Sequence, residues 1–112
     1  SNGEGPVNWI VGLYQYYQKY DQPQGIRVVG DSMFPTLLEG DEILVDSSPP
    51  VRLAAGLWVM RIDDALMVKR LVRQGRDWRV VSDNPDVEDP GPWDSARMEL
   101  RGRVIRAVRR FR

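Results

Sequence analysis

The stretch GDSMFPTLLEGD (residues 30–41) sets Ser32 in a glycine-led turn between two strand-like runs, 26–29 and 42–46. Glycine reaches backbone conformations that other residues avoid, and Pro35 fixes its own φ and lacks a backbone donor. The stretch is therefore expected to be stiff without being regular, which suits a nucleophile. Gly, Asp, Ser and Pro are also the commonest turn formers, so an ordinary loop between strands would have a similar composition.

The sequence contains no histidine and no cysteine. This excludes a Ser-His-Asp triad, a thiol nucleophile and a Cys/His zinc site. If Ser32 is activated, another group must take its proton. A lysine whose pKa is lowered by burial is the remaining side chain that can act as a base near neutral pH.

Lys19 and Lys69 are the only lysines among 16 basic residues, so lysine is not the usual cation of this chain. Lys69 lies in the strand-like run 65–72, where alternate residues share a face. Counting by twos places it with Met67 and Leu71 on an apolar face. Loss of hydration there would lower the pKa of the ammonium group and let the amine accept a proton from a serine hydroxyl. The alternative is a lysine that extends its charge past the edge of the sheet.

The rest of the chain predicts a mainly β domain of antiparallel strands and hairpins. Gly102 is expected to mark a bulge or bend in the last strand, and the Pro-, Asp- and Gly-rich segment 84–96 is expected to be a long surface loop. Residues 63–64 and 74–77 are expected to join successive strands as hairpins. Further strands are predicted at 57–62, 65–72, 78–82 and 98–111.

The segment 7–20 fits two periodicities. Ile10, Tyr14 and Tyr17 fall on one face of a helix, whereas the apolar alternation over 7–13 would also fit a strand. We expect a helix. The aromatic side chains of this segment are expected to pack against the domain, with an exposed contact surface as the alternative.

Five motifs lie in order along the chain: VGDSMFPTL at 29–37, Gly40-Asp41 before a hydrophobic strand, VKRL at 68–71, VSDNP at 81–85 and RGRVI at 101–105. Together they resemble the successive motifs of the LexA-like family. That family comprises SOS and phage repressors with a self-cleaving serine-lysine peptidase domain, together with UmuD-type polymerase accessory proteins. The resemblance covers about residues 26–111 and implies a LexA-like peptidase fold, with antiparallel strands and hairpins in a strongly bent sheet and one possible N-terminal helix.

The resemblance implies peptide-bond hydrolysis. Ser32 Oγ would attack a carbonyl, and neutral Lys69 would accept the proton and pass it to the leaving amine before water resolves the acyl-enzyme. The backbone N–H groups of Ser32 or Met33 are expected to form the oxyanion hole. Met33 is also expected to anchor the loop and Pro35 to stiffen it, while residues 82–84 are expected to be structural or to line the substrate channel. No cofactor or metal is implied.

In the family, the substrate is the protein's own upstream linker, usually cut at an Ala-Gly or Cys-Gly bond. The only Ala-Gly pair here, Ala55-Gly56, lies between nucleophile and base, and no X-Gly pair upstream of Ser32 is a good match. Residues 1–6 are interpreted as a tag remnant and linker, and 7–112 as the C-terminal peptidase and dimerisation domain, with the N-terminal DNA-binding domain absent from this chain.

Three functions therefore stay open at this point. The first is a self-cleaving phage-type or SOS-type transcriptional repressor. The second is a non-cleaving dimerisation domain that keeps the peptidase scaffold. The third is a UmuD-like accessory of a lesion-bypass DNA polymerase. The native residues upstream of the peptidase domain would separate the first from the third, because a repressor has a helix-turn-helix domain there.

Composition limits the partners. With 16 basic and 16 acidic residues, the domain as a whole is not expected to bind nucleic acid. The arginines of 101–112 could contact nucleic acid, but they are expected to be solvated or paired with the acidic loop before them. No apolar run approaches a membrane span and no leader is visible, so a cytoplasmic protein without membrane contact is expected. The resemblance implies a homodimer, stimulation of cleavage by the RecA filament on single-stranded DNA, and operator DNA bound through an N-terminal helix-turn-helix domain.

Overall fold

The computed structural model describes residues 24–109, which form one seven-stranded antiparallel sheet. The mainly β fold expected from the sequence is confirmed, and the helix predicted at 7–20 lies outside the described residues. Within 24–109 there is no helix long and apolar enough to cross a membrane. The strands run across the sheet in the order β1-β2-β7-β3-β4-β5-β6. Their bounds are β1 Gln24–Arg27, β2 Glu42–Asp46, β3 Gly56–Ile62, β4 Ala65–Gln74, β5 Asp77–Val81, β6 Gly91–Pro92 and β7 Met98–Val108.

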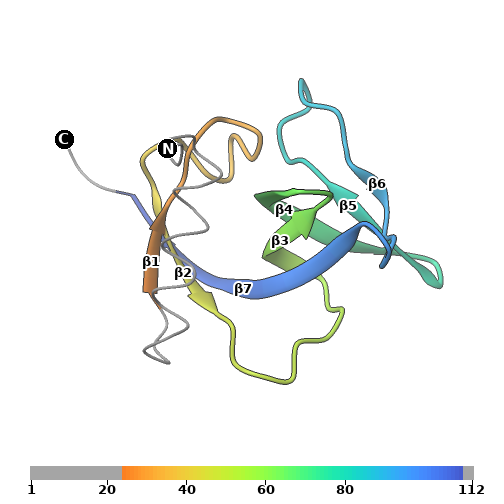
Figure 1. Cartoon of the computed structure of the whole chain (residues 1–112). Coiled ribbons are helices and arrows are strands. Elements are labelled where there is room, and N and C mark those ends of the chain that lie inside the picture. The colour runs from red at the N-terminus through yellow and green to blue at the C-terminus, as the bar shows by residue number, and fades with distance from the viewer. Residues whose placement is uncertain (1–23, 110–112) are drawn as a thin grey trace.

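The last strand, β7, joins the two halves of the sheet and curves through the domain (Figure 1). It pairs with β2 on one side and with β3 on the other. Its register against β3 shifts where Val59 pairs with Gly102 and Met60 with Leu100. Arg101 is therefore an extra residue in β7, and the bulge predicted at Gly102 lies directly beside it. Such a bulge increases the local bend of the strand.

The first strand is shorter at its C-terminal end than the predicted run 26–29, because the chain turns away after Arg27. Val28 N–H donates to the carbonyl of Asp41 at 2.7 Å, and Gly40 N–H donates to the carbonyl of Val28 at 2.9 Å. These two bonds close the base of residues 28–41, which we call the serine loop. The loop thus projects from the β1–β2 hairpin as a unit.

The predicted long surface loop 84–96 also contains structure that the sequence did not indicate. Val80 pairs with Gly91 in the short strand β6, and the N–H of Trp93 donates to the carbonyl of Trp78 at 2.9 Å. Asn84 is buried. Proline and glycine are poor strand formers, so this short edge strand leaves no periodic pattern in the sequence.

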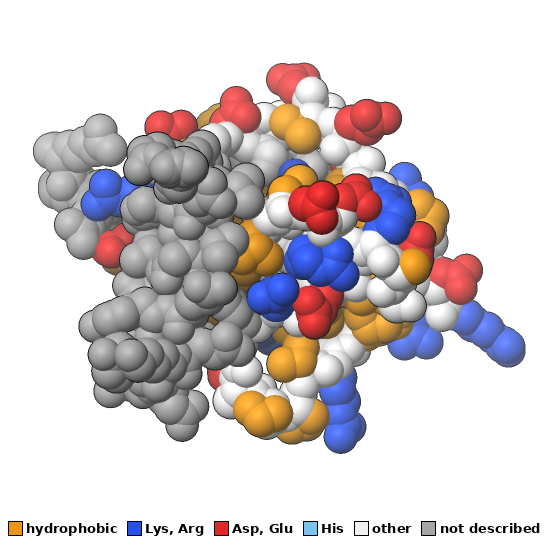
Figure 2. All heavy atoms as spheres, viewed as in Figure 1, with side chains coloured by type: hydrophobic (Ala, Val, Ile, Leu, Met, Phe, Trp, Pro, Cys, Tyr) orange, Lys and Arg blue, Asp and Glu red, His pale blue; other side chains and the backbone are white. Residues whose placement is uncertain are grey.

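Surface charge is mixed. Figure 2 shows basic and acidic side chains next to one another on one face of the domain. Arg101 pairs with Glu99 at 2.9 Å and Arg109 pairs with Asp41 at 3.1 Å. These arginines are salt-bridged as expected, but their partners are not in the acidic loop 84–96 as predicted. Glu99 lies two residues before Arg101 on β7 itself, and Asp41 directly precedes β2, which pairs with β7.

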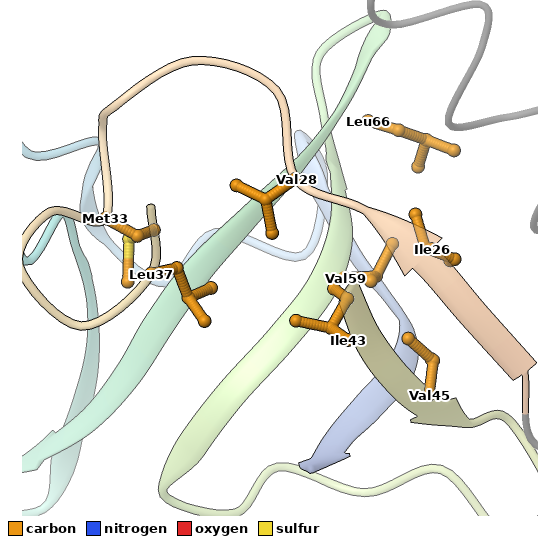
Figure 3. Close-up of a cluster of buried hydrophobic side chains, with 8 residues drawn as sticks. All are labelled: Ile26, Val28, Met33, Leu37, Ile43, Val45, Val59 and Leu66. Atoms are coloured by element: carbon orange, nitrogen blue, oxygen red, sulfur yellow. The ribbon is translucent and has the colours of Figure 1, made fainter. Parts of the chain in front are cut away.

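Buried side chains form two clusters, one on each face of β3. Val59 belongs to the first cluster and its neighbours Trp58 and Met60 to the second, because successive residues of a strand point to opposite faces. The first cluster, shown in Figure 3, consists of Ile26, Val28, Met33, Leu37, Ile43, Val45, Val59 and Leu66. The second consists of Trp58, Met60, Ile62, Leu71, Val80 and Met98.

Candidate active site

Ser32 lies in the serine loop, in a turn that follows Gly30. Gly30 has φ +83°, a conformation that favours glycine. Met33 and Leu37, which are 3% and 1% exposed, point from the loop into the first hydrophobic cluster (Figure 3). These two buried side chains hold the turn against the sheet. Ser32, which lies in the same turn, is half-buried.

The backbone beside Ser32 presents free donors. In the part of the chain that the structure describes, the N–H groups of Ser32 and Met33 have no hydrogen-bond partner, whereas the next N–H, of Phe34, donates to the carbonyl of Asp31 at 3.0 Å. An oxyanion hole needs unengaged donors close to the nucleophile. The two amides selected from the sequence are thus available to an oxyanion, and that role stays a prediction.

Lys69 is buried on β4, with only 6% of its surface exposed. Its strand neighbours Met67 and Leu71 contribute to the second cluster, as the alternation predicted. Burial lowers the pKa of Lys69, and the negative charge of Asp89 partly offsets this effect. The amine of Lys69 is therefore easier to deprotonate than that of an exposed lysine.

The ammonium group of Lys69 is bonded to a serine, but not to Ser32. Lys69 Nζ donates to Ser82 Oγ at 2.8 Å. Between residues 24 and 109, no hydrogen bond joins Lys69 to Ser32. The sequence had assigned Ser82 to a structural or channel-lining role, so its contact with the lysine was missed.

Residues 82–84, which follow β5, connect the lysine strand with the serine loop. On the strand side, Ser82 accepts a hydrogen bond from Lys69, and Asp83 binds Arg70. Arg70 Nε and Nη2 donate to the two carboxylate oxygens of Asp83, each at 2.8 Å. This bidentate contact holds the pKa of Asp83 below its usual range. We call residues 82–84 the bridging segment.

The same segment bonds the backbone of the serine loop. Asn84 N–H donates to the carbonyl of Ser32 at 3.1 Å, and Asn84 Nδ2 donates to the carbonyl of Asp31 at 3.0 Å. The hydroxyl of Thr36 donates to the carboxylate of Asp83. The bridging segment therefore fixes the nucleophile loop relative to the strand that carries the lysine.

A signal for this arrangement was present in the predicted hairpin. Arg70 pairs with Val81 in the β4–β5 hairpin, so the antiparallel register places Ser82 opposite Lys69. Counting pairs outward from the predicted 74–77 turn along the two predicted strands would have brought these two residues together. The docking of Asn84 against the serine loop has no such local signal.

Two clefts flank the bridging segment. The one beside Lys69 has a volume of about 410 Å³, and the one beside the serine loop about 530 Å³. Pro35, exposed rather than packed, lines the second cleft together with Phe34, which is 48% exposed. Within 24–109, no group of three carboxylates is placed to hold a metal ion. The first cleft is lined by Ile62, Met67, Lys69, Glu88, Asp89, Pro90 and Arg97.

A comparison with protein-family models gives a match for this chain. A family model described as Peptidase S24-like matches residues 12–105, most of the chain. The chain therefore belongs to the Peptidase S24-like family, which is the family of LexA, UmuD and phage repressor peptidases. The LexA-like resemblance drawn from the five motifs is confirmed. A search among curated proteins finds no match.

Proposed function

We propose that this domain is the C-terminal peptidase and dimerisation domain of a phage-type or SOS-type transcriptional repressor, and that Ser32 and Lys69 cut the protein's own upstream linker. The observation that carries the proposal is the bridging segment. It ties the loop of a half-buried serine to the strand of a buried lysine in a chain without histidine or cysteine. Membership of the S24-like family supports the same assignment.

The chemistry follows from these groups. Ser32 Oγ attacks the carbonyl carbon of the scissile bond and gives its proton to the neutral amine of Lys69. The N–H groups of Ser32 and Met33 stabilise the negative oxygen of the tetrahedral intermediate. Lys69 then protonates the leaving amine, and water hydrolyses the acyl-enzyme. Burial makes this possible because it lowers the pKa of Lys69 and so raises the neutral fraction.

The partners in this proposal come from the family resemblance. They are a second copy of the chain, the RecA filament on single-stranded DNA as the stimulus of cleavage, and operator DNA bound by a helix-turn-helix domain. The proposed location is the cytoplasm, where such DNA lies. Size-exclusion chromatography with light scattering tests the homodimer directly.

One observation favours a second candidate, a non-cleaving dimerisation domain. Lys69 donates its hydrogen bond to Ser82 and makes none to Ser32 within the described residues. In a non-cleaving domain this contact would be permanent. In the self-cleaving repressor the same contact holds the amine in place while the side chain of Ser32 turns towards it. A UmuD-like accessory is a further alternative, and a short upstream arm without a DNA-binding domain would identify it.

Intact-mass spectrometry of the full-length protein tests the proposal. The protein is aged at pH 7 and at about pH 10, with and without RecA filament, beside Ser32→Ala and Lys69→Ala. We expect the wild type to split at one bond upstream of Ser32, faster at the higher pH because more of Lys69 is neutral. Both variants should stay whole.

Two matched controls accompany this experiment. Lys19→Ala removes the other lysine of the chain, and Ser95→Ala removes an exposed serine far along the sequence from the loop. Both should cleave at the wild-type rate. If the wild type stays whole under every condition, the peptidase assignment fails and the domain is a dimerisation scaffold. If Lys69→Ala still splits, the base is a different group.

A further inference from the structure

We infer that Ser82 is the positioning residue of Lys69: its hydroxyl accepts the hydrogen bond of Lys69 Nζ and holds the amine beside the serine loop. The inference rests on the proposed function and adds a third side chain to it. Ser82 Oγ lies 2.8 Å from Lys69 Nζ, and both residues are buried. A buried amine with this partner has little freedom to take another orientation.

Ser82 is itself held from two sides by the segment that follows it. Its N–H donates to Asp89 Oδ1 at 2.8 Å, and its hydroxyl lies 3.4 Å from the carbonyl of Glu88, which it can reach as a donor. The hydroxyl therefore has an acceptor for its own proton while its oxygen accepts from the lysine. Both hydrogen-bonding capacities of the serine are used.

A hydroxyl suits this position better than a charged group would. It can accept from the ammonium form of Lys69 and donate to the neutral amine, so it orients both protonation states. A carboxylate in direct contact would favour the ammonium form and keep the lysine from acting as a base. The carboxylate of Asp89 instead accepts a hydrogen bond from the backbone N–H of Ser82. The negative charge of Asp89 is therefore bonded to the backbone of Ser82 and not to the amine of Lys69.

The bridging segment also links this contact to the nucleophile. Two residues after Ser82, Asn84 N–H donates to the carbonyl of Ser32 at 3.1 Å. The bridging segment therefore fixes the position of the lysine amine through the side chain of Ser82 and the position of Ser32 through the backbone N–H of Asn84. A displacement of that backbone would move base and nucleophile together, whereas loss of the Ser82 hydroxyl would release the base alone.

Substitution of Ser82 tests the inference in the full-length protein. Ser82→Ala should reduce the first-order rate constant of self-cleavage by about a hundredfold, the loss expected when a reacting group is misplaced by about 1 Å. Because Thr and Val have the same shape, Ser82→Thr and Ser82→Val form a matched pair. The threonine variant should retain most of the activity and the valine variant should lose it like alanine. Near-UV circular dichroism checks that each variant is folded.

A second readout does not depend on cleavage. This measurement uses the 112-residue chain, which has two lysines, so selective ¹³C labelling of lysine gives two side-chain signals, and Lys69→Arg assigns that of Lys69. Loss of the Ser82 acceptor should move the titration of Lys69 to lower pH in Ser82→Ala and Ser82→Val but not in Ser82→Thr. The signal of Lys19 serves as the internal reference.

The outcomes are distinct. An unchanged Lys69 titration in Ser82→Ala and Ser82→Val overturns the positioning role, whether or not the protein cleaves itself. A wild type that never cleaves, but in which the titration moves as expected, refutes the proposed function and leaves the contact established. If Ser32→Ala still cleaves and Ser82→Ala does not, Ser82 is the nucleophile and the inference is overturned.

Discussion

At the scale of single residues, the buried charge of Lys69 opposes folding. Burial lowers its pKa, so the folded protein releases this proton at a lower pH than the unfolded chain, in which lysine titrates near 10.4. Between those two pH values the unfolded chain binds more protons, and the free energy of unfolding rises with pH. We therefore expect Lys69→Met to stabilise the protein by about 1–2 kcal/mol at pH 7 and to lose most of this advantage by about pH 10.5, measured by urea unfolding.

The control for this prediction is Arg76→Met, at an exposed cation in the β4–β5 turn. It removes the same formal charge without removing a buried one, so its effect on stability should be small and nearly equal at the two pH values. If Lys69→Met changes the free energy of unfolding equally at pH 7 and at about pH 10.5, burial of the ammonium group is not the cause.

Asp83 has the opposite pH dependence. Its hydrogen bonds to Arg70, and to a lesser extent that from Thr36, keep the pKa of its carboxyl group low. Because the folded pKa lies below the unfolded value of about 3.9, the stabilisation is present above the unfolded pKa and is lost as the pH falls through the folded pKa. Asp83→Asn should lower the free energy of unfolding by about 1 kcal/mol at pH 6, since Arg70 is one-third exposed.

The measurement is chemical unfolding of wild type and Asp83→Asn at pH 6 and pH 2. As the pH falls from 6 to 2, a growing share of the wild-type carboxyl is protonated, so the difference in stability between the two proteins should shrink. A difference that persists undiminished at pH 2 would mean that the ion pair with Arg70 is not what the substitution removes.

At the scale of elements, the bridging segment controls the mobility of the serine loop. Thr36 is exposed, yet its hydroxyl bonds the carboxylate of Asp83. Thr36→Val keeps the shape and removes this bond, which should speed amide exchange at Leu37 by roughly fivefold, the factor that corresponds to about 1 kcal/mol. Exchange at Gly40, whose N–H bonds the base of the loop, should not change.

Hydrogen exchange followed by NMR separates these amides. Thr36→Ser restores the hydroxyl and is the matched control, with exchange rates expected to return to those of the wild type. Amides of the β4–β5 hairpin report global opening and should be the same in all three proteins. Equal exchange at Leu37 in Thr36→Val and wild type would mean that the contact with Asp83 does not restrain the loop.

Local patterns account for most of the elements that were predicted correctly. Strand β2 has the predicted bounds because a short continuous apolar run, Ile43 to Val45, is bounded by turn residues. The turns at 63–64 and 75–76 follow from their short polar loops, and Asp63 adopts φ 52° in the first of them. The strands that these turns join differ from the prediction by one or two residues at their ends. Hydrogen bonds to the neighbouring strand determine where each strand ends.

The docking of the serine loop could not be predicted in this way. It depends on contacts such as those of Asn84 with Asp31 and Ser32, which join residues some 50 positions apart. No periodicity or turn signal encodes such a pair. Ser32 and Lys69 were found because their chemistry is unusual in this composition, whereas Ser82, one of several serines, is distinguished only by where the hairpin register places it.

At the scale of the whole molecule, β3 contributes to both hydrophobic clusters and should make unfolding cooperative. Ile43 is fully buried in the first cluster, and Ile43→Ala should lower the free energy of unfolding by about 2–5 kcal/mol. Trp58, Trp78 and Trp93 pack in or against the second cluster. In Ile43→Ala, the unfolding midpoint followed by tryptophan fluorescence should nevertheless shift to lower denaturant by the same amount as the midpoint followed by far-UV circular dichroism.

Leu71→Ala, at a fully buried position of the second cluster, is the reciprocal test and should likewise shift both signals together. A fluorescence midpoint that stays at the wild-type value in Ile43→Ala, while the circular dichroism midpoint moves, would show that the two halves of the sheet unfold independently. Coincident transitions are the expected result for a small single sheet.

The hydrogen bonds that close the base of the serine loop at Val28, Gly40 and Asp41 also bear on how such domains diversify. Because β1 and β2 are paired up to this point, insertions or replacements inside the loop leave the register of the sheet unchanged. Descendants of one ancestral scaffold can then differ in the recognition surface around the serine while inheriting the same framework. The same boundary marks where the loop of one relative can be grafted onto another.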